Sequence, residues 1–344
     1  MYYLLLLLVI VLITFMFLVF KIDVKNNKKY LMTIFIILTL FLGIRGENVG
    51  LDMGNYNEFF VSTLNNNWNH LFLYYNFEIG FKIYTKLITL FTDNFRIYIF
   101  ITALISITGI YYYIKENSKN YFSSIFIFVT FNYYIYLFCT LRQAMAVSIL
   151  LLAYNFLKKN NNIKFLLLVI LATFFHKTAI VFLVLFLAKK IPYNIKLITI
   201  YIVSCLLLFI FKVPLINFFT NLLYSQYIDY GDMSGSGYTM IIFLFAIVIA
   251  ICYIFRFKGK ENNKMLIYML LLSIPFQILS TEQGLVARIV LYFTHSLIIL
   301  LPNFIEQFNI FHRNKVKCLY YISLALFFIM EVSKNAMYVS YNLK

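Results

Sequence analysis

The run YYLLLLLVIVLITFMFLVF at residues 2–20 decides the fold class of this chain. It contains no charged residue, and it has the length of about 20 apolar residues that a helix needs to cross a bilayer. We expect a retained membrane helix rather than a signal peptide, because the run has no positively charged leader and no small-residue cleavage site before Lys21. The chain of 344 residues is 63% hydrophobic and 12% charged, which is too apolar for a water-soluble domain. The sequence predicts an all-α polytopic membrane protein with a single transmembrane domain, residues 1–344.

Ten further apolar runs follow, and polar, mostly short connections separate them. They lie at residues 30–44, 95–114, 121–138, 143–157, 165–188, 195–211, 239–255, 265–279, 287–302 and 317–332.

Lysine and arginine outnumber aspartate and glutamate by 29 to 13, and six short loops hold 19 of these cations. Positively charged loops remain on the cytoplasmic side of a membrane, so topology rather than nucleic-acid binding explains the net charge of +16. The basic loops are 21–29, 115–120, 158–164, 189–196, 256–264 and 312–317. All six share one side only if the run 165–188 enters and leaves the membrane by the same face.

The run 165–188 is therefore expected to form a half-membrane hairpin. Its arms, 165–175 and 178–188, would each be about 16 Å of helix, which is half the hydrocarbon thickness. His176 and Lys177 would form the turn, at a depth where polar backbone is tolerated only in a cavity or inside protein. The alternative is one uninterrupted span. With the hairpin, ten helices cross the membrane and both termini lie outside.

Two long segments lie opposite the basic loops. The segment 45–94 contains an apolar stretch, 77–91, in which Glu78, Lys82 and Lys86 recur at a spacing of four, and this pattern predicts an interfacial helix on the outer surface. The segment 212–238 ends in DYGDMSGSG at 229–237, a Gly/Ser-rich loop that is the best lid candidate in the chain.

The ionisable side chains away from the basic loops are the candidate functional groups, because charge is costly in a membrane. Arg142 and Arg288 each begin an apolar helix on the side that disfavours cations, and Arg45 lies on the same side. Guanidinium groups bind phosphate oxygens in pairs and stay protonated, so these arginines predict a diphosphate site that does the work of a divalent metal. The alternative is that they extend from helix ends toward the interface.

Asp52, Glu78 and His176 are the groups in this set that can exchange a proton near neutral pH. Each has a structural alternative: Asp52 can orient an arginine, Glu78 can pair with Lys82, and His176 can be a core histidine. The sequence leaves open which of the three is the base. It contains no carboxylate pair typical of Mg²⁺ and no zinc-ligand spacing, and its four cysteines are scattered, so neither a metal nor another cofactor is expected.

At these positions the chain resembles the EpsG-like branch of the Wzy-type bacterial polysaccharide polymerases. The order of several short motifs along the hydrophobic profile carries the resemblance. The matching stretches are Arg45 with 49–52 and Tyr56, residues 77–81, residues 141–143 with Ala144 and Ala146, residues 175–179, and Ala287 and Arg288 with Tyr292. The chain departs from the family pattern at Lys177, where a small polar residue is commoner, and at Leu51 and Met53, where threonine is frequent. Neither departure removes a charge that the chemistry needs.

The resemblance implies a metal-independent glycosyltransferase with a GT-C-like membrane fold. It would polymerise undecaprenyl-diphosphate-linked repeat units into exopolysaccharide, capsule or O-antigen at the outer face of the cytoplasmic membrane. The implied partners are a lipid-linked donor and acceptor, the bilayer and a chain-length regulator. Arg142, Arg288 and Arg45 would hold the diphosphate, and Asp52, Glu78 or His176 would activate the acceptor hydroxyl. The residues expected to position sugars are Tyr56, Tyr292 and Gln143.

Three rival functions fit part of this pattern. A glycan transferase such as an O-antigen ligase would share the donor chemistry and use a different acceptor. A lipid-linked oligosaccharide flippase or another transporter would spread polar residues through the bilayer depth, whereas here they crowd one face. A membrane acyltransferase would place its histidine and aspartate nearer the basic loops.

Overall fold

The computed structural model describes residues 2–69, 71, 76–191, 195–223, 237–255, 260–307 and 310–334, and this part of the chain is helical and contains no strand. The chain divides into two compact units, one formed by residues 1–180 with 301–344 and the other by residues 181–300. Five of the described helices are long and apolar enough to cross a membrane, or seven if each of two bent helix pairs is one span. The chain is thus a membrane-embedded helical protein.

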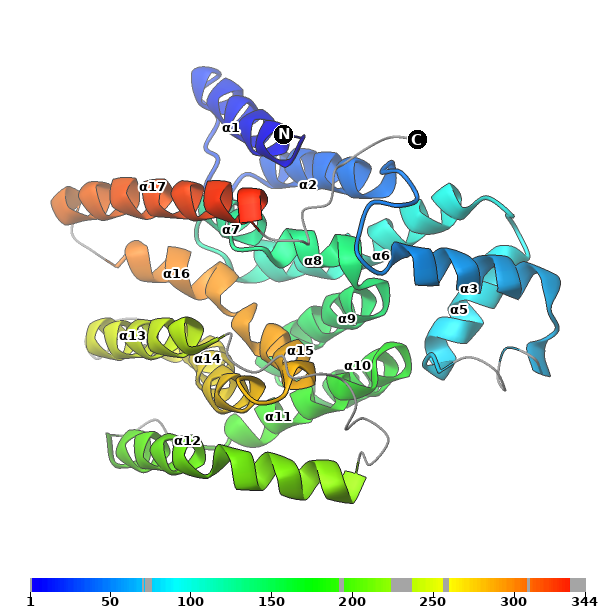
Figure 1. Ribbon diagram of the computed structural model, residues 1–344. Coiled ribbons are helices and arrows are strands. Elements are labelled where there is room, and N and C mark those ends of the chain that lie inside the picture. The colour runs from blue at the N-terminus through cyan, green and yellow to red at the C-terminus, as the bar shows by residue number, and fades with distance from the viewer. Residues whose placement is uncertain are drawn as a thin grey trace. The chain divides into compact units, whose positions relative to one another are not determined.

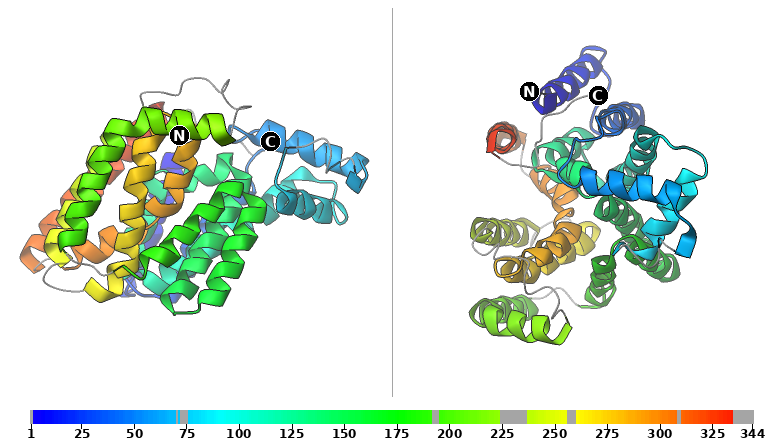
Figure 2. Two further views of the ribbon diagram at one scale, coloured as in Figure 1. Left: turned by 90° about the horizontal axis from the view of Figure 1, so that it is seen from below. Right: turned by 45° about the vertical axis from the view of Figure 1, so that its right-hand side comes forward.

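The first unit contains most of the helices (Figure 1). They are α1 (Tyr2–Val19), α2 (Lys28–Gly43), α3 (Met53–Asn65), α5 (Ile79–Thr89), α6 (Phe95–Asn117), α7 (Tyr121–Thr130), α8 (Tyr133–Cys139), α9 (Leu141–Lys158), α10 (Asn162–Phe175) and α17 (Ile310–Lys334). Within this unit, α9 packs between α6 and α10, and α2 packs on α6 (Figures 1 and 2).

The second unit is built around α14 (Lys260–Ser280), which contacts α11 (Val184–Ala188), α12 (Ile195–Leu223), α13 (Tyr238–Phe255) and α15 (Gly284–Thr294). Two elements, η1 (Lys177–Leu183) and α16 (Leu297–Ile305), contain the boundaries between the units. The predicted lid 229–237 lies outside the described residues except for Gly237, and α12 continues beyond residue 211 as far as Leu223.

Every apolar run predicted from the sequence is helical in the described residues, and three of the runs are broken. The run 121–138 bends by 50° between α7 and α8, where Asn132 is left-handed with a φ of 63°. The run 287–302 bends by 44° between α15 and α16. The number of crossing helices, ten, stays a prediction, because helices such as α2, with 16 residues, are shorter than a typical span.

The third break lies at His176, where the hairpin turn was predicted. Helix α10 ends at Phe175, and His176 has an extended backbone with φ −154° and ψ 114°. The helix begins earlier than predicted, at Asn162, so it is about 21 Å long instead of 16 Å. Residues 181–188 of the second arm belong to the second unit, whereas α10 belongs to the first. The reversal of the chain at this break therefore stays a prediction.

Asparagines start four helices of the first unit. The side chain of Asn27 accepts hydrogen bonds from the N–H groups of residues 29 and 30, and Asn94, Asn120 and Asn161 cap α6, α7 and α10 in the same way. Each cap satisfies a backbone donor that has no partner inside its helix, which explains why these connections are rich in asparagine.

Close backbone contact joins α6 to α9. The N–H of Gly109 donates to Oγ of Ser148 (2.9 Å), which itself donates to the carbonyl of Ile105 (2.6 Å). A Cβ on Gly109 would lie 2.0 Å from the Ser148 carbonyl oxygen, so only glycine permits this approach.

Four of the predicted basic loops meet at one end of the first unit, which we call the basic end: residues 25, 115–121, 155–159, 303–306 and 317. The N–H of Tyr121 donates to the carbonyl of Lys25 (2.7 Å), Lys159 pairs with Glu116 (2.8 Å), and Lys317 pairs with Glu306 (2.5 Å). Burial opposes ionisation of Glu306, but Lys317, Asn120 and Lys25 lower the pKa of its carboxyl. The structure thus brings together loops that positive charge assigns to one side of the membrane.

Helix α5 has its charged row on the inside. Lys82 is buried, and Lys86 donates to the carbonyls of Thr63 (2.8 Å) and Asn66 (3.0 Å) at the C-terminal end of α3. The exposed row consists of apolar side chains: Ile79, Ile83, Leu87, Leu90 and Phe91. This arrangement suits a helix whose outer stripe contacts lipid.

Candidate active site

Glu78, Arg142 and His176 meet at the end of the first unit opposite the basic end. Oε2 of Glu78 lies 2.5 Å from Nη1 of Arg142, and Oε1 lies 3.2 Å from Nδ1 of His176. The N–H of Lys177 also donates to Oε1 of Glu78 (3.2 Å). Helix α9 runs from Arg142 to Lys158 at the basic end, which separates the two ends by about 24 Å. Three of the residues predicted to do chemistry therefore form one cluster, although 98 positions separate Glu78 from His176 in the chain.

The start of α5 brings Glu78 to the other two residues. Glu78 precedes α5 as its N-cap, but its side chain makes no capping bond and turns to Arg142 and His176 instead. Two residues later, a Cβ on Gly80 would lie 2.7 Å from the carbonyl oxygen of Phe174 on α10. The glycine allows α5 to approach the end of α10, where His176 follows.

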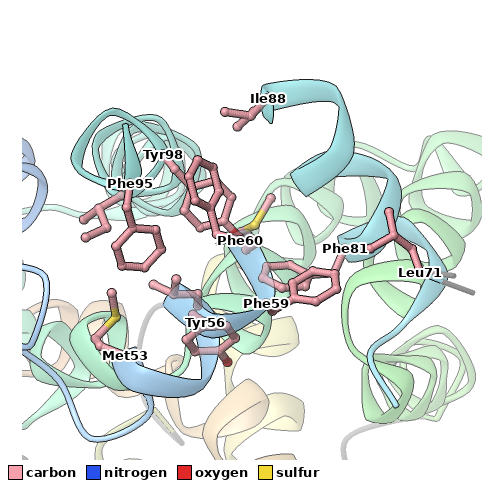
Figure 3. Packing of buried hydrophobic residues seen from close by; sticks show 12 residues of the cluster. Met53, Tyr56, Phe59, Phe60, Leu71, Phe81, Ile88, Phe95 and Tyr98 are labelled. Carbon is pink, nitrogen blue, oxygen red and sulfur yellow. The ribbon is translucent and has the colours of Figure 1, made fainter. Parts of the chain in front are cut away.

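Aromatic side chains hold the site from the α3 side. Met53, Tyr56, Phe59 and Phe60 on α3 pack with Phe81 and with residues of α6 and α9 in a buried hydrophobic cluster (Figure 3). Tyr56 is hydrogen-bonded to Arg142, and the guanidinium of Arg142 lies over the ring of Phe77, 4.5 Å from its centroid. Arg142 is thereby fixed by an ion pair, a hydroxyl and an aromatic ring.

The site has an excess of positive charge. Burial by itself raises the pKa of the Glu78 carboxyl, but the contact with His176 and the charge of Arg142 outweigh it and lower the pKa to about 2. Lys82 and Lys177 add two cations, and burial lowers the pKa of Lys82, as does the charge of Lys177. The site thus contains one carboxylate, the guanidinium of Arg142 and two lysines, one on α5 and one directly after His176, a balance of charge that attracts an anionic ligand.

Arg45 and Asp52 lie at the start of α3 and belong to a neighbouring group. Arg45 is buried, donates from Nη2 to Sδ of Met53 (3.3 Å), and lies over the ring of Phe138, 4.8 Å from its centroid. Asp52 is the N-cap of α3 and is half-buried. Burial raises the pKa of Tyr56, the charge of Arg142 lowers it, and the charge of Asp52 adds a smaller increase. Within the described contacts Asp52 pairs with no arginine.

The remaining predicted site residues are Gln143, Arg288 and Tyr292, and no contact with Glu78 is described for them. Gln143 is buried on α9, next to Arg142. Arg288 is exposed and Tyr292 is buried, one turn apart on α15 in the second unit. Both residues therefore belong to the second unit, whereas the cluster around Glu78 belongs to the first.

Sequence reasoning missed three features of the two units. Two of them are contacts at the site: the ring of Phe77 lies under Arg142, and the backbone N–H of Lys177 donates to Glu78. An aromatic ring and a backbone N–H are both uncharged, so the search for ionisable side chains did not find these contacts. In the second unit, Lys212 pairs with Glu282 (2.6 Å) and donates to Tyr238 (2.8 Å) and Thr281 (2.9 Å). A lysine within the apolar run FIFKVPL at 209–215 was the available signal, because a charge in such a run requires a partner.

In the described residues, no group of three or more His, Cys, Asp or Glu side chains is arranged to hold a metal ion.

These observations define a membrane-embedded, all-helical protein with a charged site opposite its basic end. Comparison with known protein families matches residues 28–343, nearly the whole chain, to the EpsG family, and the chain belongs to that family. Membership indicates a role as a polysaccharide polymerase in general terms. No curated protein and no solved structure matches the chain significantly.

Proposed function

We propose that this protein transfers a growing glycan from a lipid diphosphate to a sugar hydroxyl of a second lipid-linked repeat unit. The lipid is undecaprenol, and the polymer is exopolysaccharide, capsule or O-antigen. The observation that carries the proposal is the convergence of Arg142, His176 and Glu78 in a site with excess positive charge. A lipid diphosphate is the anion that such a site fits in a membrane polymerase.

Each predicted residue has a role in this reaction. Arg142 binds the donor diphosphate, assisted by Arg45 and Arg288, and the guanidinium groups neutralise the charge that grows on the departing diphosphate in place of a metal ion. The acceptor hydroxyl loses its proton to a group of the cluster around Glu78. Tyr56, Gln143 and Tyr292 position the sugars.

The site faces the outer side of the cytoplasmic membrane in this proposal. Its support is the separation of the site from the basic end along α9, since basic loops stay cytoplasmic. The exposed apolar row of α5 then lies at the outer membrane surface, where lipid-linked substrates present their headgroups.

Replacing Arg142 by lysine tests the arginine's role. Lysine keeps the charge but loses the paired N–H groups, so it cannot hold Glu78 and a phosphate oxygen at once. We expect high-molecular-weight polymer to fall at least about tenfold, measured by gel analysis of cells with matched protein levels. Arg96→Lys is the control, because Arg96 forms an exposed ion pair with Glu47 (3.6 Å) at the same end of the unit. Normal polymer from Arg142→Lys would reject diphosphate binding by this residue.

A further inference from the structure

The two ring nitrogens of His176 differ in what lies beside them: Nδ1 lies beside the carboxylate of Glu78, and Nε2 has no such neighbour. Its side chain is 8% exposed, and Nδ1 faces Oε1 of Glu78 at 3.2 Å. Both nitrogens are buried and neither makes a well-aligned hydrogen bond to the described residues, so the contact of Nδ1 with Glu78 is an ion-pair contact and Nε2 has no polar partner. A buried ring nitrogen in this state is suited to a ligand that is not yet present.

The carboxylate of Glu78 has no comparable capacity. Oε2 is taken by Arg142, and Oε1 faces both the N–H of Lys177 and Nδ1 of His176. The same contacts hold its pKa near 2 against the opposing effect of burial. A carboxylate that is stabilised in this way is a weak proton acceptor at neutral pH.

We propose that Glu78 is a positioning residue that holds Nδ1–H of His176, so that Nε2 is the atom that takes the proton from the acceptor hydroxyl. This inference rests on the proposed function, and it identifies the base among the three candidates. The arrangement uses the same logic as other carboxylate–imidazole pairs, in which the carboxylate fixes the tautomer and stabilises the imidazolium.

The step balances as a single displacement. The acceptor oxygen forms a bond to the anomeric carbon while its proton moves to Nε2 of His176. The bond from the anomeric carbon to the diphosphate oxygen breaks, and its electron pair leaves with the lipid diphosphate, which the arginines hold. The imidazolium then gives its proton to water or to the released diphosphate.

Charge around the ring explains why the carboxylate is needed. Glu78 faces His176 from the start of α5, Arg142 from the start of α9, and Lys177 follows His176 in the chain. Tyr56 reaches the group through Arg142, and Lys82 lies near Lys177. Without Glu78, the charged side chains that these contacts place near the imidazolium are Arg142, Lys177 and Lys82, which are all cations.

The experiment measures kcat, KM and the pH–rate profile of the full-length protein in lipid nanodiscs, with lipid-diphosphate-linked repeat units extracted from producing cells as substrate. His176→Gln is expected to lower kcat about 100-fold or more with little change in KM, and to remove the acid limb of the profile. Glu78→Gln is expected to lower kcat but keep the acid limb. Glu78→Asp, which restores a carboxylate, is expected to recover part of the loss. Glu306→Gln, in a different ion pair of the same unit, is the control with unchanged kcat.

The outcomes separate the two proposals. An acid limb that persists in His176→Gln and disappears in Glu78→Gln would make Glu78 the base and overturn the inference. Rescue of His176→Gly by added imidazole would support the inference that His176 is the base. This second variant provides a test even if His176→Gln folds poorly. Failure of the wild-type protein to extend the glycan would instead reject the proposed function, before any variant is compared.

Discussion

Glu78 contacts two side chains and a backbone N–H at once, so its ionisation is linked to folding. A carboxyl with a lowered pKa in the folded protein stabilises that state above its unfolded pKa and loses the contribution as the pH falls. For Glu78 the window runs from about 4.5 down to about 2. A shift of this size corresponds to at most about 3 kcal/mol of folding free energy.

We therefore expect the stability difference between the wild type and Glu78→Gln to be large at pH 7 and to shrink at pH 3, because a protonated glutamate resembles glutamine. Thermal unfolding of both proteins in one detergent at the two pH values measures this. The control is Glu58→Gln, which changes an exposed glutamate on α3. An equal difference at both pH values would contradict the linkage.

The sequence identified Glu78, Arg142 and His176 as candidates because charge is costly in an apolar chain. It could not show that Glu78 pairs with Arg142 rather than with Lys82, its neighbour one turn away, since spacing along a helix says nothing about contacts from other helices. Phe77 was equally invisible as a contact of Arg142, because aromatic residues are abundant throughout the chain.

At the scale of elements, the site depends on the close contact between α5 and α10. Gly80→Ala would force a Cβ to within 2.7 Å of the Phe174 carbonyl oxygen, so α5 must shift and carry Glu78 away from His176. We expect polymer synthesis to fall at least about fivefold, and unfolding to occur at a lower temperature, because rigid backbone cannot give way.

Gly54→Ala provides the matched control for this variant. No heavy atom lies within 4 Å of a Cβ on Gly54, which is in α3, and alanine favours helix by about 1 kcal/mol over glycine. The control should keep full synthesis and gain stability. Normal synthesis by Gly80→Ala would show that the site tolerates displacement of α5.

The apolar and charged rows of α5 were readable from the sequence, but the outward direction of the apolar row was not. In water the charged face of a helix is normally the exposed one. In α5 the charged row serves the site and α3, and the apolar row is exposed. The sequence predicted the helix, but only the structure shows which residues its charged row contacts.

On the scale of the whole molecule, the direction of the chain after His176 sets the topology of the C-terminal half. If residues 165–188 form a hairpin, the loop 189–196 shares the side of the other basic loops. A topology reporter fused after Lys190 is then expected to give a cytoplasmic signal, with a fusion after Lys159 as the reference for that side. An external signal from the Lys190 fusion would establish a single span.

The sequence predicted the helical runs well because each is long and almost free of charge. It was weaker on where runs break, since Asn132 and His176 interrupt helices through contacts and backbone conformation that periodicity does not reveal. The role of Arg288 stays a prediction: its position in the sequence matches that of Arg142, and the two residues belong to different units.

If α5 lies at the membrane surface as proposed, its exposed apolar row links the site mechanically to the bilayer. Ile79 and Ile83 are exposed on the same helix turns that carry Glu78 and Lys82 inward. A change in membrane thickness or lateral pressure would press on that stripe and move the carboxylate relative to α10. The rate of polymer growth would then depend on the lipid composition of the membrane as well as on the supply of repeat units.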